Sequence, residues 1–149
     1  ALDSGILRKY IADFPTPALI GRYDVILMPH IGASTDEAED NCAIMAADQL
    51  LDFLENGNIR NSVNFPSLEL ERVSGCRLSV TNENVPRILG SVLAILADEN
   101  INVIDMLNKS RDEVAYNLID IGNQPTDAAL EKMQSLEGVI NVRLIGDCA

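Results

Sequence analysis

The chain has a single histidine, no tryptophan and only three cysteines among its 149 residues. Cys42, Cys76 and Cys148 are odd in number and lack the spacing of a zinc site. The sequence therefore predicts no metal site and favours a reducing compartment, the cytoplasm. Aromatic residues make up only 4% of the chain, which disfavours a stacking platform for nucleic acid bases or sugars.

Positive charge and long apolar runs are scarce as well. Eleven Lys and Arg stand against 23 Asp and Glu, and the formal net charge of −12 disfavours binding to nucleic acid or to an anionic membrane surface. The longest apolar stretch, residues 88–97, contains Gly90 and Ser91 and falls short of the roughly 20 residues of a membrane span. Asp3 and Lys9 interrupt any signal-peptide pattern. With 47% hydrophobic residues, the chain is nevertheless expected to fold into a globular protein.

The beginning of the chain has the pattern of an α/β layer. A short strand is expected at residues 9–12, and a second strand at residues 25–28. The second strand is apolar throughout, as strands in parallel sheets are. Pro15 and Pro17 exclude a helix in the segment that joins the two strands.

A long amphipathic helix is expected after this layer. Ser34 or Thr35 can cap its first turn, which is rich in acidic residues, and Asn56 followed by Gly57 predicts its end. Its apolar residues keep helical spacing, which predicts that they face a core; they are Ala38, Cys42, Met45, Ala46, Leu50, Phe53 and Leu54. Residues 65–75 are expected to form a linker.

The remainder of the chain predicts four strands and two helices in the order βαββαβ. This order is typical of the ferredoxin-like layout, an antiparallel sheet with both helices on one face. A sheet this small leaves a face or an edge in need of cover, so pairing with a second copy is expected. The predicted elements are a strand from Cys76 to Val80, a helix opened by Pro86, strands at 102–110 and 113–121, a helix between Thr126 and Gly138, and a strand at 139–145.

The single histidine, His30, follows the second predicted strand and lies in the run Leu-Met-Pro-His-Ile-Gly-Ala-Ser-Thr. An α/β enzyme places acid and base groups at this end of a strand. Oxidation of a secondary alcohol requires a base to take the hydroxyl proton while hydride leaves, and an imidazole suits that step. Gly32 would let the backbone approach a ligand closely. The alternative is a loop histidine bonded to the backbone.

Three segments in this order resemble the D-2-hydroxyacid dehydrogenase family, and within it the phosphoglycerate dehydrogenases. They are Leu-Met-Pro-His-Ile-Gly-Ala-Ser-Thr at 27–35, Asn-Cys-Ala at 41–43 and Asn-Ser-Val-Asn-Phe-Pro at 61–66. The βαββαβ segment is similar to the ACT regulatory domain at the carboxyl terminus of those enzymes. The resemblance implies an α/β fragment, the end of a Rossmann-like NAD domain plus a long helix, followed by an α+β ferredoxin-like ACT domain.

The resemblance also implies a division of the chain and a function. Residues 1–33 would end the NAD-binding domain, 34–64 would form the long helix and the return to the substrate domain, 65–75 a linker, and 76–149 the ACT regulatory domain. The implied activity belongs to serine biosynthesis, with 3-phosphoglycerate oxidised to 3-phosphohydroxypyruvate by NAD. L-serine would act as feedback effector, and the ACT domains would form a homodimer or a higher homo-oligomer.

The chain by itself is expected to be inactive. The substrate-binding arginine and the Gly-x-Gly-x-x-Gly phosphate loop of the family belong upstream of the matched segments and are absent here. The alternative function is a free-standing ACT-type module that binds an amino acid without catalysis.

The resemblance assigns residues to the active site. His30 matches the catalytic acid/base, and with Ile31, Gly32 and Ala33 it would lie against the nicotinamide end of NAD. Asp13 matches the aspartate that contacts the carboxamide of the cofactor. The family's glutamate partner of the histidine lies in a Phe-Pro-Thr-Glu-Pro segment, which reads Phe-Pro-Thr-Pro here. Asp13 is the nearest substitute for the missing glutamate.

Serine-inhibited relatives bind the amino acid between two paired ACT modules. The matching positions are Asn82 and Asn84, just before the first helix of the module, and Asn102, at the start of its second strand. Some relatives carry histidine at the position of Asn82. Taken without the resemblance, Asn84 could instead cap the helix, and Asn102 could tie down a turn.

Overall fold

The computed structural model describes residues 1–73 and 75–146, so Cys148 lies outside the described residues. The chain divides into two compact units, Ala1–Ile44 and Met45–Ala149, which we describe one at a time. No helix within the described ranges is both long enough and apolar enough to cross a membrane.

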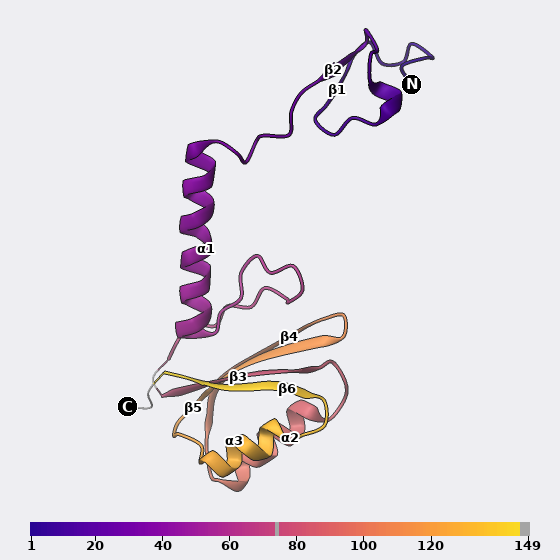
Figure 1. The fold of residues 1–149 in the computed structure, drawn as a ribbon. Helices are drawn as coiled ribbons and strands as arrows, with labels where there is room; N and C mark the ends of the chain where they lie inside the picture. The colour runs from indigo at the N-terminus through magenta and orange to yellow at the C-terminus, as the bar shows by residue number, and fades with distance from the viewer. Residues whose placement is uncertain (74, 147–149) are drawn as a thin grey trace. The chain divides into compact units, whose positions relative to one another are not determined.

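The first unit contains one pair of parallel strands (Figure 1). Strand β1 (Tyr10–Ala12) pairs with β2 (Val25–Leu27), and the 3-10 helix η1 (Pro17–Leu19) lies between them in the sequence. The parallel pairing confirms the predicted α/β layer. In residues 1–44, all of which are described, only Ala12 and Asp24 are buried. This unit therefore has almost no core of its own.

Helix α1 (Asp36–Asn56) begins in the first unit and ends in the second. Of the two predicted caps, Thr35 accepts a hydrogen bond from the Ala38 amide at 3.2 Å. The helix ends where predicted, because Gly57 takes a left-handed conformation with φ of 74°. The prediction that Cys42 lies in a core is wrong: Cys42 is exposed, and although every α1 residue is described, none of them is buried.

The second unit contains the predicted ferredoxin-like layout, which we call the βαββαβ module (residues 76–145). Its four strands form one antiparallel sheet in the order β4-β5-β3-β6, with both helices on one face (Figure 1). The elements are β3 (Cys76–Glu83), α2 (Ile88–Asp98), β4 (Val103–Arg111), β5 (Val114–Ile121), α3 (Asp127–Gln134) and β6 (Val139–Ile145).

Apolar side chains pack on both faces of this sheet. The helix-side cluster includes Leu78, Val80, Ile119, Val92, Leu96 and Met133. On the other face, Ile59 and Leu68 form an antiparallel bridge and pack against Tyr116, Leu118 and Ile145. The sequence predicted that an open sheet face would need cover. Residues 57–72 of the same chain provide part of that cover.

The module helices differ from their predicted limits. Helix α2 begins at Ile88 and not at Pro86, because Arg87 adopts a left-handed conformation with φ of 82° that delays the first turn. Thr126 caps α3 as predicted, accepting from the Ala129 amide at 3.2 Å. That helix ends at Gln134, before Gly138, whose φ of 83° belongs to the turn into β6.

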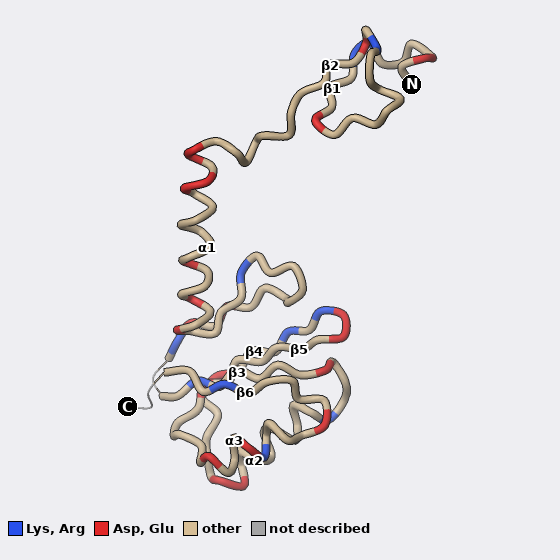
Figure 2. Tube along the Cα trace, in the orientation of Figure 1, with Lys and Arg blue, Asp and Glu red and all other residues tan. Residues whose placement is uncertain are grey.

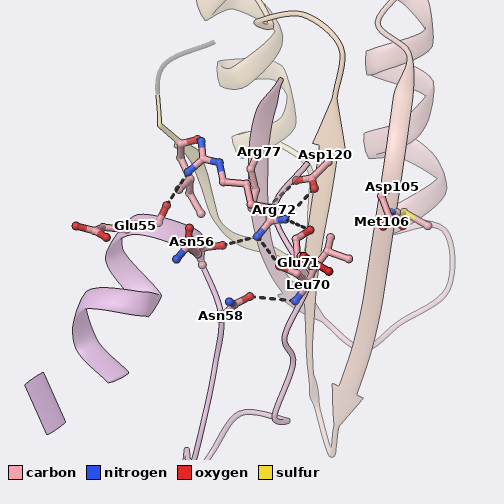
Figure 3. Close-up of polar contacts among 12 residues, drawn as sticks. Glu55, Asn56, Asn58, Leu70, Glu71, Arg72, Arg77, Asp105, Met106 and Asp120 are labelled. Atoms are coloured by element: carbon pink, nitrogen blue, oxygen red, sulfur yellow. Dashed lines mark hydrogen bonds and ion pairs between the residues drawn. The ribbon is translucent and has the colours of Figure 1, made fainter. Parts of the chain in front are cut away.

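A buried arginine ties the end of α1 to the sheet (Figure 3). Arg77 donates from Nε and Nη2 to the two carboxylate oxygens of Asp120, at 2.6 and 2.7 Å. Its remaining N–H groups donate to the main-chain carbonyls of Asn56, Leu70 and Glu71 at 2.9 to 3.1 Å. All five guanidinium N–H groups are thus bonded, so this buried charge is fully compensated.

Two further arginines bind carbonyls in the last turn of α1, which has no basic residue of its own. Arg72 donates to the Glu55 carbonyl at 2.9 Å (Figure 3), and Arg143 donates to the Phe53 carbonyl and lies 4.6 Å from the centre of the Phe53 ring. Positive charge near a helix C-terminus offsets the partial negative charge of the unpaired carbonyls. The second half of α1 is therefore an integral part of the second unit.

Candidate functional site: a histidine loop and an effector loop

The candidate catalytic histidine lies where the two parallel strands end. The strand register pairs Ala12 with Leu27, so the residues that follow them emerge at the same edge. His30 Nδ1 lies 2.8 Å from Asp13 Oδ2. The imidazole is thus bonded to a carboxylate, and the side chains remain 61% and 51% exposed.

This geometry defines the chemistry that the pair can perform. A carboxylate only accepts, so a neutral imidazole in this arrangement donates from Nδ1 and leaves Nε2 as the acceptor. Phe14 contacts the imidazole edge-to-face, with 4.7 Å between ring centres. The pair can take a proton from a substrate hydroxyl at Nε2, while Asp13 stabilises the resulting imidazolium.

The loop after His30 leaves open space on its ligand side. It is tightened by hydrogen bonds from the Ile31 amide to the Pro29 carbonyl at 3.1 Å and from the Ser34 amide to the Ile31 carbonyl at 3.0 Å. A Cβ atom built on Gly32 would meet no atom within 4 Å, and Ile31 is 56% exposed. Among the described residues, no atom near Gly32 would prevent a ligand from approaching this backbone.

Charge around the loop is negative. The first turn of α1 carries Asp36, Glu37 and Glu39, and Figure 2 shows acidic residues at the start of this helix. These carboxylates disfavour a phosphate at Ser34 or Thr35. Among the described residues, no group of three or more His, Cys, Asp or Glu side chains is placed to hold a metal ion.

An ion-pair network that was not predicted from the sequence supports the strand pair. Arg22 binds both carboxylate oxygens of the buried Asp24, at 2.8 and 2.7 Å, and also Asp3 at 2.8 Å. The Arg22 guanidinium holds the pKa of the Asp24 carboxyl below its ordinary value. The Asp24 carbonyl accepts from the Tyr10 amide at 3.0 Å, which ties this network to β1. The Arg-x-Asp spacing was the only available signal.

The candidate effector residues have different environments. Asn82 is only 4% exposed, and its amide is engaged internally: Nδ2 donates to the Glu83 carbonyl at 2.6 Å and Oδ1 accepts from Asn117 at 2.8 Å. Asn84 is exposed and donates to the Asp112 carbonyl at 3.1 Å. The alternative in which Asn84 caps α2 is therefore wrong. The N-cap position is occupied by Arg87, which makes no side-chain capping bond among the described residues.

The sheet register separates Asn84 from Asn102 within one module. Asn84 follows the end of β3 that pairs with Val114, while Asn102 precedes Val103, which pairs with Ile121. The seven residue steps along β5 correspond to roughly 23 Å. One copy therefore does not bring these two asparagines together.

Two pockets lie in the second unit. One of about 350 Å³ is lined by the β3–α2 loop, including Glu83 and Arg87, and by Glu137 and Gly138 before β6. Another, of about 420 Å³, lies on the opposite sheet face and is lined mainly by apolar residues, Phe53, Phe65 and Tyr116 among them. Both volumes are within the range of small-molecule sites.

Comparison with known proteins finds relatives named as D-3-phosphoglycerate dehydrogenases. The chain is 33% identical over 124 residues to D-3-phosphoglycerate dehydrogenase of Escherichia coli (strain K12), covering 82% of this chain and 30% of the relative. It is 32% identical over 123 residues to the Haemophilus influenzae enzyme. D-3-phosphoglycerate dehydrogenase 2 of Saccharomyces cerevisiae is 34% identical over 138 residues, covering 87% of this chain and 29% of the relative.

Solved structures that match part of the chain include an ACT domain from the GTP pyrophosphokinase of Chlorobium tepidum, with TM-score 0.42 and 13% identity, covering 48% of this chain and 97% of that one. An ACT domain protein from Streptococcus pneumoniae has TM-score 0.40 and 14% identity, covering 49% and 91%. No family model matches the chain. The chain spans less than a third of the length of the curated relatives it matches. Over that span, the resemblance to phosphoglycerate dehydrogenases predicted from the three sequence segments is confirmed.

Proposed function

We propose that this chain supplies the histidine loop and the regulatory module of an NAD-dependent D-3-phosphoglycerate dehydrogenase. Such an enzyme works in the cytoplasm and oxidises 3-phosphoglycerate to 3-phosphohydroxypyruvate in serine biosynthesis. The observation that carries the proposal is the 2.8 Å contact between His30 Nδ1 and Asp13 Oδ2 at the carboxyl ends of two parallel strands. The identity with enzymes of that name over 82% of the chain supports it.

His30 is the proposed base. Its Nε2 takes the proton of the substrate hydroxyl, and Asp13 holds the opposite nitrogen and stabilises the charged ring. Asp13 thereby takes the role of the glutamate missing between Thr16 and Pro17. NAD, when bound, supplies the acceptor for the hydride that leaves the carbon.

The residues of the loop fit a cofactor that approaches the backbone closely. The space over Gly32 is open, so Ile31, Gly32 and Ala33 would pack against the nicotinamide end. One oxygen of Asp13 is bonded to His30, and the other would accept from the carboxamide. The remaining walls of the site would come from residues that precede this chain in the complete enzyme.

The test joins the part of the Escherichia coli relative that precedes the matched region to this chain. We expect the chimera to form NADH from 3-phosphoglycerate, and His30→Gln to lower kcat by roughly 10²- to 10⁴-fold. Asp13→Asn should lower kcat as well, whereas Thr16→Ala, a neighbouring change outside the pair, should not. Turnover by the 149-residue chain alone, or full activity of His30→Gln, would contradict the proposal.

The regulatory part of the proposal is a paired module with L-serine between two copies. The separation of Asn84 and Asn102 by the length of a strand supports this arrangement, because a two-fold axis would bring Asn84 of one copy near Asn102 of a second. Asn82, with its amide engaged internally, would position the loop, contributing less to direct contact.

The two edges of the sheet differ in their capacity to pair. At the β6 edge, the Gln134 amide donates to the Ile140 carbonyl at 3.2 Å and accepts from the Val142 amide at 2.8 Å. This side chain occupies two of the main-chain groups that a new strand would need. The β4 edge has no strand partner among the described residues, so β4 is the proposed pairing edge.

Light scattering and calorimetry test the regulatory part. We expect a dimer at micromolar concentration and heat on addition of L-serine, with Asn84→Ala weakening the affinity roughly tenfold, the effect of one hydrogen bond to a charged group. A monomer, or no heat with the unsubstituted chain, would contradict it. Serine binding together with an inactive chimera would favour the alternative function, a free-standing amino-acid-binding regulator.

A further inference from the structure

Three side-chain amides from adjacent strands form an unbroken row of hydrogen bonds across the sheet. Asn108 on β4 donates to Oδ1 of Asn117 on β5. Asn117 donates to Oδ1 of Asn82 on β3 at 2.8 Å and to the Val80 carbonyl at 3.0 Å. Asn82 donates in turn to the Glu83 carbonyl at 2.6 Å. We call Asn108, Asn117 and Asn82 the amide row.

The main chain fixes the direction of this row. The carbonyls of Val80 and Glu83 can only accept, so Asn117 and Asn82 must turn their NH₂ groups toward them. Each Oδ1 then faces the preceding donor in the row. The three amides consequently point the same way, from the β4 edge toward the β3–α2 loop, and bonds aligned in series strengthen one another.

Asn117, the central residue of the amide row, lies where burial of a polar side chain costs free energy. Asn117 is fully buried, and Ile119 and Ile121 on the same face of β5 belong to the apolar cluster under the helices. An unbonded amide at such a position destabilises the fold, whereas an apolar residue of the same size would pack without that cost. All hydrogen-bond partners of Asn117 belong to β3 or to the edge strand β4. Loss of the Asn117 amide should therefore affect the conformation of those two strands.

The row begins at an accessible point and ends at the candidate effector loop. Asn108 is exposed and lies on β4, the edge that has no strand partner among the described residues. The Glu83 carbonyl is the last main-chain group of β3 before Asn84. Between them, the β3–β6 register shifts at Thr81 and Asn82, so the bonds of Asn82 hold the strand where its regular pairing is interrupted.

We propose that the amide row couples pairing at the β4 edge to the conformation of the β3–α2 loop, with Asn117 and Asn82 as positioning residues. A second copy that binds the free end of the Asn108 amide fixes its orientation, strengthens the bonds of Asn117 and Asn82, and holds the Glu83 carbonyl. The loop that carries Asn84 is then ordered before the effector arrives. The serine part of this inference rests on the proposed regulatory function.

Hydrogen exchange of the 149-residue chain tests the row without any ligand. The Glu83 and Asn84 amides donate to the Gly138 and Glu113 carbonyls at 2.7 and 2.8 Å and report on the loop. Asn117→Leu should accelerate their exchange roughly tenfold relative to the rest of the sheet, since it leaves the buried Asn82 oxygen without its donor. The matched control, Ile119→Val, changes a buried residue on the same strand and face and should leave that ratio unchanged.

A second variant keeps the test valid if Asn117→Leu fails to fold. Asn108→Ala, at an exposed position, removes only the outer donor and should produce a smaller acceleration in the same two amides. In calorimetry with L-serine, Asn117→Leu should weaken the affinity about tenfold while Ile119→Val does not. Unchanged exchange of Glu83 and Asn84 in the Asn variants overturns the amide row as a coupling element, and so does an unchanged serine affinity in Asn117→Leu. If L-serine produces no heat with the unsubstituted chain, the effector proposal is contradicted. The hydrogen-exchange measurements alone then test the amide row.

Discussion

The two units of this chain differ in how much of their own structure they support. The first unit buries two residues and pairs two strands of three residues each. The second has apolar clusters on both faces of a four-stranded sheet and a buried ion pair. The candidate catalytic pair lies in the first unit, and the candidate effector loop lies in the second. The strand pair that carries Asp13 and His30 therefore has almost no core of its own, whereas the sheet of the second unit is packed on both faces.

Truncation gives the largest expected contrast between the units. A chain of residues 34–149 should unfold in urea with the same midpoint as the full chain, since the clusters lie entirely within it. A peptide of residues 1–44 should show no cooperative transition, because an isolated pair of short strands is at best marginally stable. Far-ultraviolet circular dichroism measures both. A separate cooperative transition in the 1–44 peptide would show that the first unit folds alone.

Removing the buried arginine should give the largest effect of a single substitution. Arg77→Met leaves the buried Asp120 carboxylate and three main-chain carbonyls without donors, and we expect it to lower the free energy of unfolding by about 3–5 kcal/mol. The matched control is Arg60→Met, whose guanidinium is half exposed and pairs with Asp52 at 3.2 Å and Glu69 at 2.9 Å. An exposed pair is worth about 0–1 kcal/mol. Urea denaturation that gives equal losses for the two variants would contradict the role assigned to Arg77.

Two glycines within the second unit should respond to alanine with opposite signs. At Gly57, φ is 74° and a Cβ atom would lie 2.7 Å from Ile145 Cδ1 and from Leu118 Cδ2, so Gly57→Ala should destabilise by about 1–3 kcal/mol. At Gly90, within α2, a Cβ atom would meet nothing within 4 Å. Gly90→Ala should stabilise the protein by about 0.5–1 kcal/mol through helix propensity. Thermal unfolding measures both, and a stabilising Gly57→Ala would show that the α1 terminus is loosely packed.

Local signals in the sequence predicted most of the fold. Alternating apolar residues gave the strands of the module, Thr126 marked the start of α3, and Gly57 marked the end of α1, because each of these depends on residues close in sequence. Contacts between distant residues could not be predicted in this way. Arg77 and Asp120 are 43 positions apart, and no local pattern indicates that they meet on one sheet face.

The candidate site shows the same difference between local signals and contacts of residues far apart in the sequence. The resemblance offered Asp13 as the nearest substitute for the missing glutamate partner of His30, and the structure brings the two side chains to 2.8 Å. The interpretation of Asn84 as a helix cap was wrong because the left-handed conformation of Arg87 moves the helix start beyond its reach. The inward bonds of Asn82 depend on Asn117, a residue 35 positions away.

The smallest expected effect concerns acid pH and compares one carboxylate from each unit. Thr126 donates from its amide and hydroxyl to Glu99, which lowers the pKa of that carboxyl below its ordinary value. The hydrogen bonds from Arg22 lower the pKa of the Asp24 carboxyl below its ordinary value. A carboxyl whose pKa is lower in the folded state stabilises that state above its unfolded pKa, and this contribution is lost as the pH falls through the folded value.

Only one of these two shifts should appear in the cooperative unfolding of the protein. Glu99 links α2 to α3 within the second unit, so Glu99→Gln should flatten the fall in urea midpoint below pH 4.5. Asp24→Asn should leave that fall unchanged, because Asp24 stabilises a strand pair outside the cooperative core. In the unsubstituted chain, titration of Asp24 by nuclear magnetic resonance should still show the lowered pKa. If Asp24→Asn flattened the acid limb as much as Glu99→Gln, the two units would unfold as one, and the contrast between a dependent catalytic edge and a self-supporting module would have to be abandoned.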